Sequence, residues 1–110
     1  FGMGGIYVEV LKDVSFRVVP VTRQECESMV KEIASYPILV GARGKAIRDI
    51  PKTVDAISRL SYLAVKVDDI LELDINPLMV MEKGKGCKVV DSRMTIRKKL
   101  KDKISMEEST

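Results

Sequence analysis

Two stretches of the chain repeat apolar residues at the spacing of an amphipathic helix, and the pattern predicts a helix at each. Thr22 and Glu25 open the first, spaced so that each side chain can bond the other's backbone in a capping box. The second begins near Asp49 and Pro51, since proline fits a first helical turn, where its missing N–H has no partner to lose. The apolar positions are Cys26, Met29, Val30, Ile33 and Ala34 in the first stretch and Val54, Ile57, Leu60 and Ala64 in the second. Tyr36-Pro37 is expected to close the first helix.

Runs of β-branched residues near the start of the chain predict a hairpin. Residues 6–11 and 14–19 are two such runs, and they flank Lys12-Asp13. Pro20 is expected to end the second strand, because proline has no N–H to give to a ladder.

The clearest strand pattern lies in residues 71–82, where odd positions are apolar and most even positions are polar. This alternation predicts one long strand with one buried and one open face. A turn at Lys83-Gly84-Lys85-Gly86 follows, and residues 87–94 are expected to return beside the strand. Residues 38–40 add a short apolar strand that leads into Gly41-Ala42-Arg43-Gly44.

The order of these elements predicts an α+β fold, a two-layer sandwich with helices on one face of a largely antiparallel sheet. We expect residues 1–94 to form this domain. Residues 95–110 are charged, and we expect a helix from Thr95 to about Ile104 with disorder beyond it. The start at Phe1, within a glycine cluster, suggests a piece of a longer polypeptide.

Composition narrows the function classes. The 110 residues include no His, which excludes histidine acid–base chemistry and His-ligated zinc in this chain. The net charge of +3 is weak support for a nucleic-acid partner, and the basic run at residues 97–103 has no aromatic residues for base stacking, so a solvated helix end is favoured. No apolar run approaches the roughly 20 residues that span a membrane. Cys26 and Cys87 form no metal-binding pattern, and we expect free thiols in the cytoplasm.

The last hairpin carries the strongest candidate chemistry. If its two-residue loop is Lys83-Gly84, Asn76 lies directly opposite Asp91, whereas a loop at Gly84-Lys85 makes the two diagonal neighbours on the same face. Asp74 would share that face with them. Hard oxygen ligands of this kind suit Mg²⁺, which takes one or two protein oxygens and completes its shell with water and phosphates.

A simpler interpretation stays open on spacing alone. The same side chains can be the solvated face of a sheet, with Asp74 and Arg93 in a surface ion pair. In the same way, the glycines at positions 2, 4 and 5 permit an anion-binding loop or only a flexible turn. Arg43, between glycines in a loop, suits phosphate oxygens or developing charge, but can be an ordinary surface residue.

Several blocks of the sequence resemble one enzyme family. Residues 72–78, Glu-Leu-Asp-Ile-Asn-Pro-Leu, and residues 89–93, Val-Val-Asp-Ser-Arg, are similar to the end of the ATP-grasp domain in ADP-forming acetyl-CoA synthetases. Succinyl-CoA synthetase β subunits are similar there too, with Glu in place of Asp74. Residues 1–17 resemble the segment just beyond the adenine-binding hinge, and residues 41–44 match a third block in the same order. The resemblance covers residues 1–94 and implies the carboxy-terminal subdomain of an ATP-grasp module.

The resemblance implies a role for particular residues. Asn76 and Asp91 would hold Mg²⁺ on the nucleotide phosphates, with Asp74 as a third contributor, directly or through water. Glu9 matches a family carboxylate and would help to organise the metal–phosphate site, although a solvated strand residue fits equally. Gly4 and Gly5 would contribute to nucleotide binding, and Arg43 to catalysis. Ser92 stands where the family usually has Ala.

The activity implied for the parent enzyme is acyl-CoA + ADP + phosphate ⇌ acid + CoA + ATP. In the family, an acyl phosphate forms and a phosphohistidine on a CoA-binding subunit or domain carries the phosphoryl group. This chain lacks that His and the preceding ATP-grasp half with its adenine hinge and phosphate-binding lysine. We therefore expect a half-site for Mg²⁺ and ATP or ADP that is active only with those partners. The alternatives are another ATP-grasp carboxylate ligase, which residues 1–17 disfavour, and a non-catalytic binding or assembly domain with an idle metal site.

Overall fold

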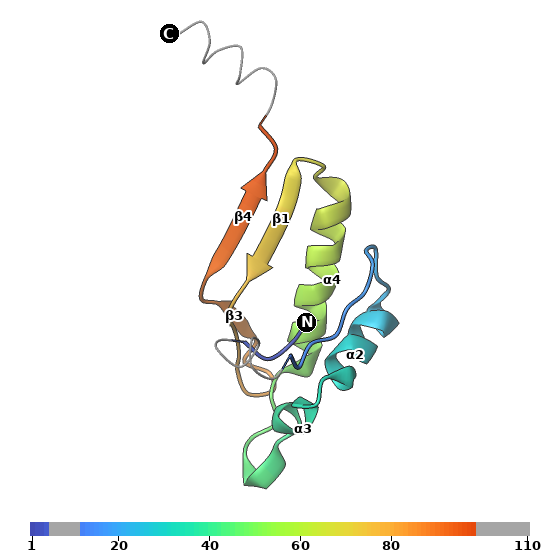
Figure 1. Ribbon diagram of the computed structural model, residues 1–110. Coiled ribbons are helices and arrows are strands. Elements are labelled where there is room, and N and C mark those ends of the chain that lie inside the picture. The colour runs from blue at the N-terminus through green and yellow to red at the C-terminus, as the bar shows by residue number, and fades with distance from the viewer. Residues whose placement is uncertain (5–11, 99–110) are drawn as a thin grey trace, which may run out of the picture.

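The computed structural model describes residues 1–4 and 12–98, and there the helices lie on one side of short antiparallel strand pairs (Figure 1). The helical elements are α2 (Arg23–Glu32), α3 (Tyr36–Leu39), the 3₁₀ turn η1 (Ala42–Gly44) and α4 (Ile50–Lys66). The strands are β1 (Ile70–Ile75), β2 (Leu78–Val80), β3 (Cys87–Val89) and β4 (Ser92–Ile96). Strand β1 pairs with β4 and strand β2 with β3, both antiparallel. The predicted α+β fold is confirmed.

The helix predicted from the capping box is α2. Thr22 Oγ1 accepts from the N–H of Glu25 at 3.2 Å, and Glu25 Oε2 accepts from the N–H of Thr22 at 2.8 Å. The end of this helix was predicted incorrectly, because Tyr36 begins α3 instead of closing α2. Pro37 lies in the first turn of α3, where its fixed φ suits a helix. The strand predicted at residues 38–40 is therefore wrong.

The core lies between α2 and α4. Cys26 and Val30 of α2 and Val54 of α4 are 0–1% exposed and pack against one another. Partly buried apolar side chains surround them: Phe1, Val21, Tyr36, Leu39, Ile50 and Ile57. This confirms most of the predicted apolar positions, with Met29 and Ile33 also buried. Ala34 and Ala64, by contrast, are exposed, and Ala34 lies beyond the end of α2.

The predicted first hairpin is only partly visible. Residues 6–11 lie outside the described residues. In the segment predicted as the second strand, Val14 forms one bridge, to Gly2, and Ser15 exchanges backbone hydrogen bonds of 2.7 and 3.0 Å with Phe1. Beyond Ser15 the described part of the chain offers no backbone partner, so residues 16–19 form no strand there. Phe16 is 79% exposed.

Side-chain hydrogen bonds, and not a β-ladder, hold residues 15–21 against the helices. Ser15 Oγ donates to the carbonyl oxygen of Met29 in α2 at 2.9 Å, and the N–H of Val21 donates to Ser61 Oγ of α4 at 2.9 Å. Both serines are buried. The segment therefore runs over the two helices, anchored at each end.

The long strand predicted for residues 71–82 is divided into β1 and β2. The break falls at Asn76-Pro77, because Pro77 has no N–H to give to a ladder. The predicted alternation also fails in part, since Leu71 and Met79 are about half exposed where buried residues were expected. Each of them lines an open cavity and so keeps one side accessible.

The end of the described chain is a strand. Thr95 and Ile96 belong to β4 and pair with Glu72 and Ile70 of β1, so the helix predicted to begin at Thr95 is wrong at its start. The remainder of that predicted tail, residues 99–110, lies outside the described residues. Within the described ranges, none of the helices is long and apolar enough to cross a bilayer. Both cysteines are free thiols, and Cys26 is buried.

Candidate functional site

The turn between β2 and β3 decides between the two predicted registers. Leu78 pairs with Val89 and Val80 with Cys87, and the N–H of Lys85 donates to the carbonyl oxygen of Glu82 at 2.9 Å across the turn. The two-residue loop is therefore Lys83-Gly84, the first of the two alternatives. This loop sets the pairing for the rest of the hairpin.

The same register continues past the break into β1 and β4. Ile75 pairs with Ser92, and the N–H of Asn76 donates to the carbonyl oxygen of Asp91 at 3.0 Å. Asn76 thus lies directly opposite Asp91, as the Lys83-Gly84 loop predicts. Asp74 pairs with Arg93 in register, but their side chains form no ion pair in the described structure. The surface ion pair of the simpler interpretation is not observed.

An open cavity of about 750 Å³ runs between the amino-terminal residues, the helices and the first part of the hairpin. Asp74, Asn76 and Gly4 all contribute to its lining. A Cβ atom added at Gly4 would lie 3.1 Å from Asn76 Oδ1 and 3.6 Å from Pro77 Cβ. The absence of a side chain at position 4 therefore allows the chain to approach Asn76 closely.

Asp74 and Asn76 line the cavity, and Asp91, which faces Asn76 in register, is not among its lining residues. Asp74, Asn76 and Asp91 are exposed, and they offer carboxylate and amide oxygens from a paired backbone. In residues 1–4 and 12–98 no group of three His, Cys, Asp or Glu side chains is arranged to hold a metal by itself. An ion that keeps most of its ligands as water and phosphate oxygens suits such a sparse set, and Mg²⁺ is that kind of ion.

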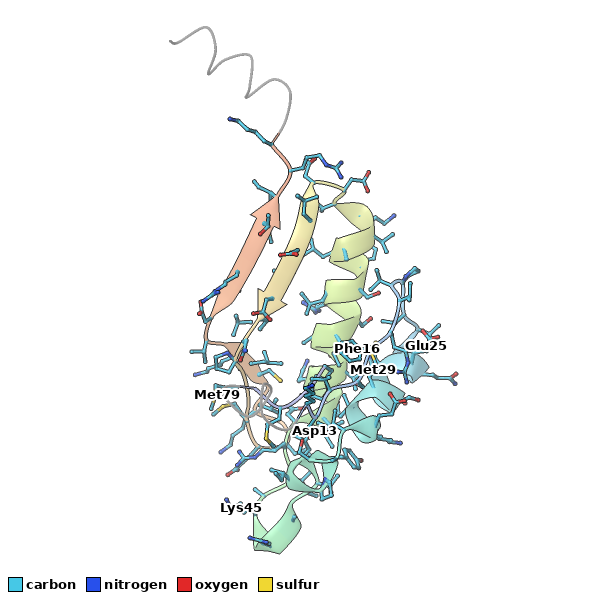
Figure 2. All side chains as sticks on the ribbon, in the orientation of Figure 1. Asp13, Phe16, Glu25, Met29, Lys45 and Met79 are labelled. Carbon is cyan, nitrogen blue, oxygen red and sulfur yellow. The ribbon has the colours of Figure 1, made fainter. Side chains whose placement is uncertain are left out.

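Arg43 lies away from this cavity. It is exposed in η1 with φ of 58°, and it is absent from the residues that line the cavity in the described chain. Figure 2 shows Lys45, two residues further on, at the end of the molecule opposite the β1–β4 pair. Position 41, two residues before Arg43, requires glycine. The φ of Gly41 is 94°, and an added Cβ would meet the carbonyl oxygen of Lys45 at 2.6 Å.

A different arginine lines the cavity, and sequence reasoning missed it. Arg48 is half-buried and shares the cavity with Asp74 and Asn76. Its backbone bridges Glu82 on the hairpin and donates to the carbonyl oxygen of Leu39 at 2.8 Å. In the sequence, the one indication of its position was that Arg48 directly precedes Asp49, the N-cap of α4. Of the other predicted site residues, Gly5 and Glu9 lie outside the described residues.

Asp13 anchors the amino-terminal segment near the same cavity. Its carboxylate accepts from the N–H groups of Ala34 at 2.6 Å and Ser35 at 2.9 Å, at the junction of α2 and α3. Hydrogen bonding from the Ser35 side chain, and then from these two N–H groups, holds the pKa of Asp13 below its ordinary value. Lys12 before it has φ of 49°, which turns the chain here.

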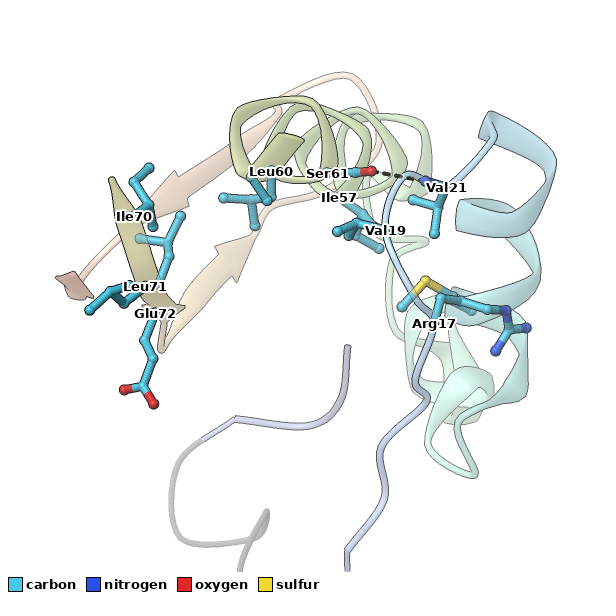
Figure 3. A pocket seen from close by; sticks show the side chains of 12 residues that line it. Arg17, Val19, Val21, Ile57, Leu60, Ser61, Ile70, Leu71 and Glu72 are labelled. Atoms are coloured by element: carbon cyan, nitrogen blue, oxygen red, sulfur yellow. Dashed lines mark hydrogen bonds between the residues drawn. The ribbon is translucent and has the colours of Figure 1, made fainter. Parts of the chain in front are cut away.

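A second cavity, of about 260 Å³, opens between residues 17–21, α4 and β1 (Figure 3). Its wall is mainly aliphatic, with Val19, Leu60 and Leu71 facing it and Glu72 at its edge. The dashed line in Figure 3 marks the hydrogen bond from Val21 to Ser61 that closes one side. Neither Asp74 nor Asn76 lines this second cavity, so we place the candidate site at Asn76 and, opposite it in the hairpin, Asp91.

A helix-backed antiparallel hairpin with an amide and a carboxylate beside an open cavity is consistent with an α+β subdomain of the ATP-grasp type. The comparison with known families gives the same result. Residues 1–96 match the family described as the ATP-grasp domain, and the chain belongs to that family.

Several relatives are named as ADP-forming CoA ligases. The chain is 52% identical over 93 residues to 4-hydroxybutyrate–CoA ligase (ADP-forming) of Nitrosopumilus maritimus, covering 84% of this chain and 13% of the relative. It is 47% identical over 98 residues to the acetate–CoA ligase (ADP-forming) II subunit beta of Pyrococcus furiosus, covering 88% of this chain and 42% of that subunit. The chain thus spans less than half the length of each of these relatives.

A solved structure shares the fold. The dinucleotide-forming acetyl-coenzyme A synthetase 1 of Ca. Korarchaeum cryptofilum, in complex with coenzyme A and Mg-AMPPCP, superposes with a TM-score of 0.82 at 44% identity. The match covers 87% of this chain and 44% of that one. The described architecture is therefore shared with part of that synthetase chain.

Proposed function

We propose that this chain is the Mg²⁺- and nucleotide-binding half of an ADP-forming acyl-CoA synthetase. The proposed overall reaction is acyl-CoA + ADP + phosphate ⇌ acid + CoA + ATP. The observation that carries the proposal is the placement of Asn76 opposite Asp91, with Gly4 close enough that an added Cβ would reach 3.1 Å from Asn76 Oδ1. The relatives named as ADP-forming ligases support the reaction.

In this proposal the residues of the chain bind and orient, and they do not react. Asn76 and Asp91 hold Mg²⁺ through one amide and one carboxylate oxygen, and Asp74 contributes directly or through water. When bound, Mg²⁺ neutralises phosphate charge and aligns the phosphoryl group for transfer. Arg48 lies in the same cavity, where a guanidinium can bind phosphate oxygens in a fixed geometry. Gly4 allows the backbone to lie close to Asn76. Gly5 and Glu9, the next candidates along the chain, complete the proposed set.

Other components complete the proposed enzyme. The adenine-binding hinge and the phosphate-binding lysine would come from an amino-terminal ATP-grasp half. A CoA-binding component would bring the phosphohistidine, because this chain has no His. Arg43, exposed on η1, is proposed to act at the moment of transfer from outside the cavity, on a group that the partner brings. We place the assembled protein in the cytoplasm.

The test uses the full-length protein that contains this chain, together with its CoA-binding component. Asp91→Asn keeps the shape of the side chain and removes one charged ligand, so at least a tenfold higher Mg²⁺ concentration should be needed for half-maximal ATP formation. Glu72→Gln is the matched control, since Glu72 is a carboxylate on β1 that lines the other cavity. An unchanged Mg²⁺ dependence in Asp91→Asn would instead support an idle metal site in a binding or assembly domain.

A further inference from the structure

Asp49 joins the start of α4 to the turn of the metal-site hairpin. It is 3% exposed, and its carboxylate accepts three backbone N–H groups. Oδ1 accepts from Lys52 at 3.2 Å, which caps α4, and Oδ2 accepts from Gly84 at 3.1 Å and Gly86 at 2.7 Å. A carboxylate buried this deeply requires such partners, and N–H bonds to a charged oxygen are among the stronger ones.

The backbone around Asp49 is tied to the same turn. Its own N–H donates to the carbonyl oxygen of Met81 at 2.8 Å, and the N–H of Lys83 donates to the carbonyl oxygen of Ile47 at 2.8 Å. Thr53, fully buried one turn into α4, donates from Oγ1 to the Asp49 carbonyl oxygen at 3.0 Å and lies 3.5 Å from Cys87 Sγ. The start of α4 is thus connected to the hairpin on both sides of its turn, at Met81 and at Cys87.

These contacts can exist in only one register. A slip of one residue would carry the N–H groups of Gly84 and Gly86 away from Asp49 Oδ2 and leave a buried carboxylate oxygen without its donors. It would also turn Asn76 and Asp91 to opposite faces, because side chains alternate along a strand. Strands β2 and β3 contribute only three paired residues each on the turn side of the break at Asn76-Pro77, whereas β1 and β4 continue the register beyond it. Asp49 therefore supplies the contacts that hold the register at the turn end.

We propose that Asp49 is a positioning residue that fixes the hairpin register and thereby holds Asn76 and Asp91 together for Mg²⁺. The proposal rests on the proposed Mg²⁺–nucleotide site. Asp49 touches neither the metal nor the nucleotide in it, and acts through the turn at residues 82–86.

The experiment separates the cap from the hairpin contact. In Asp49→Asn the side chain keeps one oxygen for the helix, and asparagine caps helices as well as aspartate does. The amide nitrogen that replaces Oδ2, however, is itself a donor. It cannot accept from the N–H groups of Gly84 and Gly86. Thr22→Ala is the matched control, because it removes an N-cap from α2, which does not bind the turn. Both variants are made in the full-length protein with its CoA-binding component.

Two readouts are taken, with thermal unfolding of each variant alongside. Hydrogen exchange by mass spectrometry follows the amides that pair the hairpin, those of Asn76, Met81 and Val90. The Mg²⁺ concentration for half-maximal binding of a nonhydrolysable ATP analogue follows the site. We expect Asp49→Asn to exchange faster across the hairpin and to need about tenfold more Mg²⁺, while Thr22→Ala lowers the melting temperature only.

Two outcomes would overturn the proposal. Unchanged hairpin exchange in Asp49→Asn would show that the register does not depend on this carboxylate. Faster exchange with an unchanged Mg²⁺ requirement would show that Asp49 stabilises the fold without positioning the site. Failure of the proposed function itself is recognised separately, since then Asp91→Asn would leave the Mg²⁺ requirement unchanged as well.

Discussion

Asn76 lies directly opposite Asp91, and the N–H of Asn76 donates to the Asp91 carbonyl oxygen at 3.0 Å. Facing residues of an antiparallel pair have Cβ atoms about 5 Å apart on the same side of the sheet. Asn76 and Asp91 lie where the β1–β4 and β2–β3 pairs meet, so the shared register puts them on neighbouring stretches of the hairpin. The following predictions address the residues around them.

Gly4→Ala should weaken Mg²⁺–nucleotide binding with little loss of stability. The added Cβ would meet Asn76 Oδ1 at 3.1 Å, which is tight enough to displace the ligand oxygen by a few tenths of an ångström. A loss of about tenfold in affinity is expected, as for other displaced metal-ligand shells. Titration calorimetry with Mg²⁺ and a nonhydrolysable nucleotide measures it.

Gly44→Ala serves as the control for this substitution. Gly44 has open space around it but φ of 74°, so alanine there should lower stability through backbone strain and leave binding unchanged. Equal Mg²⁺–nucleotide affinity in Gly4→Ala and the unmodified protein would show that the close approach at Asn76 is irrelevant to the ligand.

Arg48→Ala and Arg43→Ala should affect different kinetic constants. Arg48 lines the cavity, so its loss should raise the KM for ADP about tenfold or more, because a hydrogen bond to a charged group contributes about 1.5–3 kcal/mol. Arg43 is proposed to act at transfer, so its loss should lower kcat by about 10²–10³. Lys45→Ala, in the same exposed loop, is the control. An Arg43→Ala enzyme with normal kcat would identify Arg43 as a surface residue.

Ser61→Ala should destabilise the domain by about 0.5–1.5 kcal/mol, because the half-buried N–H of Val21 loses its acceptor on the buried Ser61. Ser58→Ala on the same helix is the matched control and should change stability by a few tenths of a kcal/mol. Urea unfolding of both variants gives the comparison. Equal midpoints would mean that the extended segment does not depend on this hydrogen bond.

Asp13 should make the stability of the domain depend on acidic pH. Its pKa is lower in the folded chain than the ordinary value of about 3.9, so the unfolded chain binds the proton more readily. The stabilisation is complete above the unfolded pKa and is lost as the pH falls through the lower, folded pKa. Denaturation midpoints measured from pH 6 downward should therefore fall less steeply in Asp13→Asn. Asp68→Asn, in the exposed turn before β1, is the matched control for the loss of one carboxylate.

The elements that follow from local chemistry could be predicted from the sequence. Thr22 and Glu25 identify the start of α2, and Asp49 with Pro51 identifies the start of α4, because the bonds involved join residues three apart. The sequence also limited the register of the last hairpin to two possibilities, one for each choice of two-residue loop. Lys83-Gly84 is the one that the structure adopts.

The misplaced elements depend on contacts that a sequence pattern does not contain. Pro37 can end one helix or begin the next, and the local pattern fits both. Residues 16–19 have strand composition, but a strand needs a backbone partner, and composition does not show where that partner lies. Arg48 escaped notice for the same reason, as its place in the cavity depends on the pairing of its backbone with Glu82. These are long-range relationships, and only the folded chain reveals them.

The connection between Asp49 and the hairpin turn is contained in a single continuous stretch of the chain. The hydrogen bonds that fix the register all lie within residues 47–97. A cut or a fusion upstream of residue 47 would leave both partners of each of these bonds in the same polypeptide. The register of the hairpin is thus encoded locally, although α4 also packs against α2.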